Sequence, residues 1–155
     1  MCRYLLSGFL LLLPVLAFNA IFAGALPAPF QPETFWRDIP DGLAWIENAA
    51  RIGTLVLPLL MPIALPPRPG GWWLYGVGLA AYLASWLMLM LLPASGWSTS
   101  IVGFAAPAIT PALWLGGIGL VGRPDWQMVR WAYFACCAIF IAAHVAHTLL
   151  VFSRL

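Results

Sequence analysis

The sequence predicts an all-α integral membrane bundle of five transmembrane helices, and three observations support this fold class. Hydrophobic residues make up 63% of the 155 residues and charged residues only 8%, whereas a soluble domain carries about 25% charged residues. Five apolar stretches approach the roughly 20 residues that cross a bilayer core. Short segments rich in proline and glycine separate these stretches and favour turns. Little chain remains outside them, so we expect residues 1–155 to form a single domain.

The predicted spans are, in order, residues 4–25, 43–63, 73–92, 101–121 and 131–152. The first begins after Arg3 and ends in an Ala-Gly-Ala sequence, which is also typical of a signal-peptide cleavage site. Its apolar run is longer than that of a signal peptide, so we expect an uncleaved first helix.

The arginines predict the orientation, because basic residues near the ends of spans favour the cytoplasmic side. With five spans, four arginines share the side of the N-terminus: Arg3, Arg68, Arg123 and Arg130. Two lie on the opposite side, Arg37 and Arg154. We therefore expect a multi-pass protein of the cell membrane, with a cytoplasmic N-terminus and an external C-terminus.

The external loop at 26–42 is the longest connection and combines three early prolines with bulky aromatic residues. The prolines favour an extended path, whereas Phe30, Phe35 and Trp36 would be costly to expose to water. We expect these rings either to enter the membrane interface or to fold over the bundle as a cap. Pro40 and Asp41 suit the first turn of the second helix, where proline loses no hydrogen bond and an acid faces the positive helix end.

The second span carries an ionisable pair, Glu47 and Arg51, at the four-residue spacing that favours a helical ion pair. Ionisable groups within a membrane usually face the bundle interior. Trp45 lies on the opposite face, as a lipid-facing anchor would. Two interpretations stay open: the pair serves a ligand, or the two charges only neutralise each other and fix the position of the helix.

The fifth span has two different faces. One carries Cys137, His144, His147 and Thr148. The other is a mostly small-residue stripe of the kind that permits close helix packing, formed by Ala135, Ala138, Ala142, Ala146 and Leu149. A histidine facing lipid would leave ring nitrogens unpaired in hydrocarbon, so the polar face should meet another helix or a cavity. Histidines that bond across helices for packing alone are the other interpretation.

Proline and tryptophan add weaker signals. The second and fourth spans each contain a Pro-x-x-x-Pro pair, and each proline frees a backbone carbonyl that a neighbour must satisfy. The pairs are Pro58 with Pro62 and Pro107 with Pro111. Trp86 and Trp114 fall in mid-span, away from the interfaces that usually hold tryptophan, so we expect them to pack in the interior or line a cavity.

With a rise of 1.5 Å per residue, polar groups from several spans reach a similar depth in the outer half of the membrane. They are Asn19, Glu47, Asn48, Arg51, His144 and His147, with Ser85 and Thr110 in or near the same half. Because an unsatisfied polar group in lipid costs several kcal/mol, we expect Glu47 or Arg51 to lie within direct or single-water reach of His144 or His147.

These residues predict a pocket for a small amphipathic or lipophilic ligand, with Arg51 meeting an anionic head group. The first alternative is a membrane-embedded enzyme of isomerase or cyclase type, in which Glu47, His144 and His147 are the candidate acids and bases. The second is an accessory subunit or small transporter in which the same residues are structural and a small-residue face docks a partner helix or a second copy. Whether the protein is an enzyme stays open.

Cofactors and other partners receive little support from the sequence. The charged residues are scattered along the chain, and their net charge of +2 is too small for a nucleic-acid surface. Three cysteines, two of them adjacent, form no disulfide framework. Glu47 with His144 and His147 has ligand chemistry for a metal, but one helix supplies both histidines, so we expect no closed metal site. The identity of any cofactor stays unknown.

Overall fold

The computed structural model describes residues 6–63 and 69–155, and every regular element within them is helical. Five helical segments in this part of the chain are long and apolar enough to cross a membrane: Gly8–Ala25, Asp41–Leu60, Pro69–Leu91, Ile101–Val121 and Gln127–Phe152. The five predicted spans are thus confirmed as helices, with ends that shift by a few residues. Arg3 and Arg68, on which the predicted orientation partly depends, lie outside the described residues.

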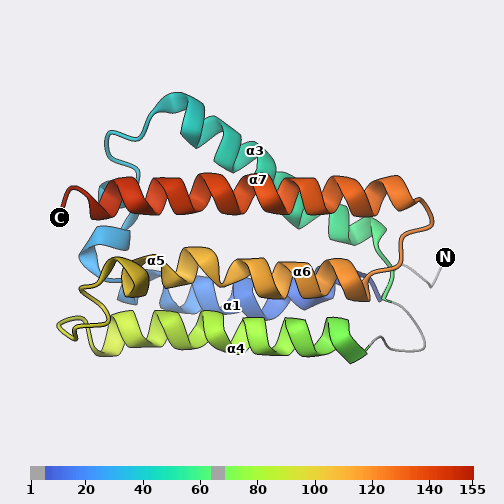
Figure 1. Ribbon diagram of the computed structural model, residues 1–155, viewed down its shortest axis with the longest axis horizontal. Coiled ribbons are helices and arrows are strands. Elements are labelled where there is room, and N and C mark those ends of the chain that lie inside the picture. The colour runs from blue at the N-terminus through green and yellow to red at the C-terminus, as the bar shows by residue number, and fades with distance from the viewer. Residues whose placement is uncertain (1–5, 64–68) are drawn as a thin grey trace.

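Several of these segments contain more than one element. The first comprises η2 (Gly8–Leu12), α1 (Leu13–Phe22) and η3 (Ala23–Ala25), and the second α3 (Asp41–Val56) followed by η5 (Leu57–Leu60). The third is α4 (Pro69–Leu91). The fourth divides into α5 (Ile101–Ile109) and α6 (Pro111–Val121), and the fifth is α7 (Gln127–Phe152). In Figure 1 these segments lie roughly along one axis, with α3 crossing α7 and α4 running beside α6.

Glycines lie at two close helix contacts. A Cβ atom on Gly78 of α4 would lie 2.4 Å from the backbone nitrogen of Trp114, and one on Gly117 of α6 would lie 2.5 Å from that of Tyr75. At the other contact, a Cβ on Gly53 of α3 would lie 2.5 Å from Sγ of Cys136 in α7. Helix backbones approach this closely only where side chains are absent, so these glycines bring α4 to α6 and α3 to α7.

Prolines end or divide two of the spans. Pro107 lies inside α5, and the break at Thr110 places Pro111 at the first position of α6, where a missing N–H costs nothing. Pro58 lies within η5. Beyond it, Pro62 pairs with Ser7, while Ile63 pairs with Gly122. These short backbone pairings join three segments at the end of the bundle where α7 begins in Figure 1.

The connection between α1 and α3 folds over the other end of the bundle, and we call residues 26–40 the cap. It contains η4 (Ala28–Phe30) and α2 (Pro32–Phe35). The Phe30 ring stacks on Phe104 with centroids 4.4 Å apart, and Phe35 is buried. Arg154 donates hydrogen bonds to the carbonyl oxygens of Arg37 and Asp38, at 2.6 and 2.8 Å. Of the two expectations for this loop, folding over the bundle is confirmed.

The small-residue stripe of α7 lies on the outside of the bundle. Its five members, Ala135, Ala138, Ala142, Ala146 and Leu149, are all exposed. Close packing of α7 instead uses the opposite face, on which Tyr133, Cys137 and His147 are buried. That face packs inward because its polar groups need partners inside the bundle. Docking of the alanine stripe against a partner helix or a second copy stays a prediction.

Candidate functional site

The α3–α7 contact joins Glu47 to both histidines. Nδ1 of His144 lies 3.0 Å from Oε1 of Glu47, and Nδ1 of His147 lies 2.6 Å from Oε2. Glu47 and His147 are completely buried, and His144 is partly exposed. The two histidines are three residues apart on one helix, which turns their rings toward the same neighbour. The predicted contact between the second and fifth spans is confirmed.

The cap completes the surroundings of His147. Its Nε2 lies 2.8 Å from the carbonyl oxygen of Phe35, and its ring stacks on the Phe35 ring at a centroid distance of 4.0 Å. A carbonyl oxygen only accepts hydrogen bonds, so Nε2 carries the proton. Nδ1 then faces a carboxylate oxygen, and a contact between two acceptors requires a proton or another cation between them.

Arg51 closes the other side of the carboxylate. Its Nη2 forms an ion pair with Oε1 of Glu47, and its Nη1 donates to Oδ1 of Asn48 at 3.2 Å. The guanidinium also lies over the rings of Trp36 and Phe140, with Cζ 5.7 and 5.5 Å from their centroids. Cation–π contacts of this kind hold an arginine that is partly withdrawn from water.

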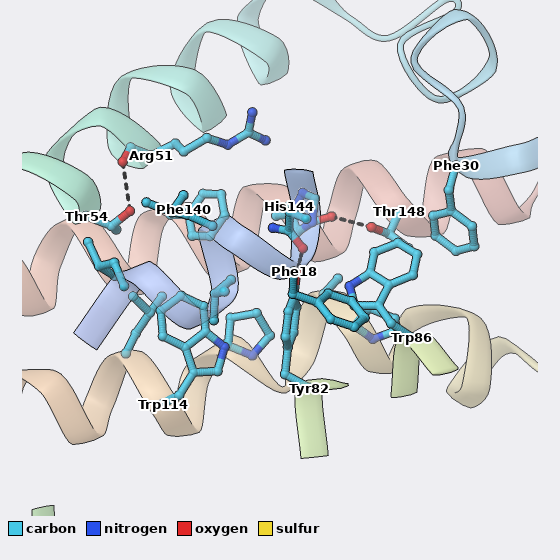
Figure 2. A pocket seen from close by; sticks show the side chains of 18 of the residues that line it. Phe18, Phe30, Arg51, Thr54, Tyr82, Trp86, Trp114, Phe140, His144 and Thr148 are labelled. Carbon is cyan, nitrogen blue, oxygen red and sulfur yellow. Dashed lines mark hydrogen bonds between the residues drawn. The ribbon is translucent and has the colours of Figure 1, made fainter. Parts of the chain in front are cut away.

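A cavity of about 380 Å³ begins at this cluster and extends between the helices. Figure 2 shows Arg51 and Thr54 at one side of it, with Tyr82, Trp86 and Trp114 among the rings that line it elsewhere. Most of the wall is apolar or aromatic, and Phe30 and Phe35 of the cap contribute to it. The polar groups at the wall are Asn19, Arg51, Thr54, Tyr82, His144 and Thr148.

The most exposed part of the cavity lining belongs to α1. The two most exposed of its lining side chains, Leu16 and Asn19, both belong to this helix. Oδ1 of Asn19 accepts a hydrogen bond of 2.8 Å from the hydroxyl group of Tyr82 in α4. A polar contact therefore marks the wall formed by α1 and α4, apart from the cluster around Glu47.

The structure joins four of the six predicted site residues in one cluster and places the other two differently. Glu47, Arg51, His144 and His147 form one connected cluster, within which Arg51 and His144 line the cavity, while Glu47 and His147 lie behind them. Asn19 lines the cavity but bonds to Tyr82. Asn48 accepts a hydrogen bond from Arg51, but it is exposed, donates to the carbonyl of Ala44 and does not line the cavity.

Ser85 and Thr110 do not join the cluster either. Each hydroxyl donates to a carbonyl of its own helix, that of Tyr82 at 2.7 Å and that of Ala106 at 2.9 Å. Such local bonding satisfies a hydroxyl within a helix without a partner from another segment. Similar depth alone therefore does not bring a polar side chain to the site.

Sequence reasoning missed two groups. One is the backbone carbonyl of Phe35, which no side-chain pattern identifies. The other is Tyr82, because its place in the sequence shows no spacing that points to Asn19. Trp86 and Trp114 were expected to pack or line a cavity, and both line it.

The chemistry available here is acid–base exchange and ligation. A carboxylate, two imidazoles and a guanidinium lie at one end of a mostly apolar cavity, and the ligating atoms of Glu47, His144 and His147 all lie within 4.8 Å of one another. Comparison with known proteins adds no assignment to this geometry: the chain matches no family model, and no curated protein or solved structure matches it.

Proposed function

We propose that this is a multi-pass membrane protein that binds a small amphipathic or lipophilic ligand in the cavity beneath the cap. The observation that carries the proposal is a cavity of about 380 Å³ with aromatic walls and one polar end. Ligand pockets have volumes of roughly 300–1,000 Å³ and are mostly apolar, with a few polar groups that fix orientation.

The charged groups of the cavity wall favour one orientation of the ligand. Arg51 and His144 line the polar end, and Arg51 keeps donors beyond those it gives to Glu47 and Asn48 because a guanidinium has five N–H groups. An acidic head group would accept from Arg51, and the tail would lie against Phe18, Trp86 and Trp114. The arginine asymmetry of the chain supports a cytoplasmic N-terminus in the cell membrane, which places the cap and the polar end in the outer half.

Tryptophan fluorescence tests this proposal. Trp86 and Trp114 line the cavity, and bromine atoms quench tryptophan on contact. We expect a brominated long-chain fatty acid to quench purified protein in detergent at a saturable site, and the matching brominated alcohol, which lacks the negative charge, to bind more weakly. Replacing Trp114 with Phe should remove part of the saturable quenching, whereas replacing the exposed Trp45 should not.

The variants Arg51→Met and Glu47→Gln/Arg51→Met separate ligand binding from charge neutralisation. If Arg51 holds the head group, Arg51→Met loses binding of the acid while the protein still inserts, and the double variant loses it too. Binding of the acid that is equal in the wild type, the single variant and the double variant would overturn the proposal.

A second function, proton transfer on a bound ligand, is favoured by the position of His144. This residue both contacts Glu47 and lines the cavity, so a proton taken from a ligand would pass to the His144–Glu47 pair. In deuterated water, the enzyme would place deuterium on carbon in the recovered ligand, and His144→Phe would abolish the exchange. A bound ligand that stays unlabelled would leave binding as the function.

A further inference from the structure

We propose that Glu47, His144 and His147 bind a divalent transition-metal ion of the zinc type. The three residues supply one carboxylate and two imidazole nitrogens, which is a ligand set that zinc uses when it keeps an open position. The sequence argument against a metal was that one helix supplies both histidines. The structure brings Glu47 of α3 into contact with both histidines, so the three ligands from two helices meet at one point.

The geometry around Nδ1 of His147 is the first argument. Its Nε2 is committed as a donor to the carbonyl of Phe35, which leaves Nδ1 with the lone pair when the ring is neutral. That lone pair faces Oε2 of Glu47 at 2.6 Å. A metal ion between the two atoms would turn this acceptor–acceptor contact into two coordinate bonds.

The spacing of the donor atoms is close to what coordination requires. Ligand atoms ~2.0–2.2 Å from a zinc ion in a tetrahedron lie ~3.4 Å from one another. The contacts of Glu47 measure 3.0 Å from Oε1 to His144 and 2.6 Å from Oε2 to His147, each less than an ångström short of that spacing. The ligating atoms of all three residues lie within 4.8 Å of one another.

The groups behind the ligands form the second argument. A metal-bound histidine almost always donates its other N–H to a carbonyl or carboxylate, and a ligating carboxylate is itself hydrogen-bonded. His147 donates to the carbonyl of Phe35, and Oε1 of Glu47 accepts from Arg51. These outer contacts fix the tautomer of His147 and leave Oε2 for the ion.

The open position would face the cavity, because His144 is the ligand that lines it. The carboxylate and Arg51 cancel each other's charge, so a divalent ion would leave a local charge of about +2 in a mostly apolar interior. Such a site favours an anion as the fourth ligand. Hydroxide or the acidic head of a lipophilic ligand has that chemistry, but binding of the ion itself needs no lipophilic ligand.

Cobalt titration of the full chain tests the site. The protein is purified in detergent without a polyhistidine tag, freed of metal with a chelator, and titrated with Co²⁺ alone. We expect one equivalent to bind with the visible absorption of a four-coordinate site, and Zn²⁺ to displace it. Glu47→Gln and His147→Gln should weaken binding by ~100-fold or more, since even losing an outer contact costs ~10–100-fold. Asn19→Ala, a cavity variant outside the ligand set, should bind as the wild type does.

The variant His144→Cys tests the site even if the variants at the buried Glu47 and His147 do not fold. His144 is partly exposed, so the protein should tolerate its replacement, and cysteine is also a metal ligand. Cobalt bound to this variant should gain the near-ultraviolet charge-transfer band of a thiolate. Absence of Co²⁺ and Zn²⁺ binding in the wild type, or binding that none of the three substitutions alters, would overturn the metal site and leave protons to bridge the cluster. Because no lipophilic probe is used, that result would not bear on the proposed ligand.

Discussion

Nδ1 of His147 lies 2.6 Å from Oε2 of Glu47, although one hundred residues separate the two in the chain. The other ring nitrogen of His147 lies 2.8 Å from the carbonyl of Phe35. One imidazole thus joins α7 to α3 and to the cap. Any substitution of His147 should therefore disturb the packing of three segments that are distant in sequence.

The Glu47–His147 contact should show strong coupling in a double-mutant cycle. Removing one partner from a buried pair costs ~3–5 kcal/mol, because it leaves the other group unpaired. We expect Glu47→Gln and His147→Gln each to destabilise the protein. The double variant should be more stable than the sum of the singles predicts, by ~0.5–3 kcal/mol. Unfolding in detergent measures all four proteins, and strictly additive effects would contradict a direct contact.

The α4–α6 contact should be sensitive to a single methyl group. Gly78→Ala places a Cβ 2.4 Å from the backbone nitrogen of Trp114, and overpacking of this kind costs ~1–3 kcal/mol. Gly76→Ala is the matched control, because nothing lies within 4 Å of its added Cβ and alanine favours helix. We expect a lower unfolding temperature for Gly78→Ala only. Equal unfolding temperatures for the two variants would mean that α4 and α6 are farther apart.

The cap should become more mobile when its contact with Arg154, near the C-terminus of the chain, is removed. Arg154 donates two hydrogen bonds to the backbone of Arg37 and Asp38, so Arg154→Ala should speed hydrogen–deuterium exchange across residues 26–40. Arg123→Ala, an exposed arginine at the other end of the bundle, is the control. Mass spectrometry of peptides from the cap reads out the difference. Unchanged exchange in Arg154→Ala would show that ring packing alone holds the cap.

Membrane orientation should be readable from single cysteines in a background without the three native ones. Gly96→Cys lies between α4 and α5, and Gln127→Cys begins α7 at the opposite end of the bundle. The arginine asymmetry predicts that a membrane-impermeant maleimide labels Gly96→Cys from outside intact cells and reaches Gln127→Cys only after permeabilisation. The reverse pattern would place the cap in the cytoplasmic half.

Hydropathy predicted the helices well because a bilayer fixes the length of an apolar span. The contact between Glu47 and the histidines was also predictable. Few groups at that depth are able to satisfy them, and leaving them unpaired costs several kcal/mol. The break at Thr110 was less evident: the Pro107 and Pro111 pair indicated a disturbed helix, but not that α6 would begin anew at Pro111.

Other details depend on which side chains become neighbours in the folded protein. A single sequence does not show these pairings. Asn48 follows Glu47 directly, and the 100° turn between successive helical residues carries it away from α7 to an exposed position. Asn19 accepts a hydrogen bond from Tyr82 because α1 and α4 lie side by side at this point. The alanine stripe of α7 was suited to packing, but no helix in the described part of the chain covers it.

The exposed part of the cavity lining, which belongs to α1, bears on how a ligand would be selected. Under the proposed insertion this side faces lipid, so the ligand would arrive from the bilayer rather than from water. Lipid tails are as apolar as the cavity wall, and each added methylene would leave one hydrocarbon environment for another. Lengthening the tail should then change affinity, expressed as mole fraction in the membrane, very little. Discrimination between candidate ligands would depend on the head group that meets Arg51 and His144.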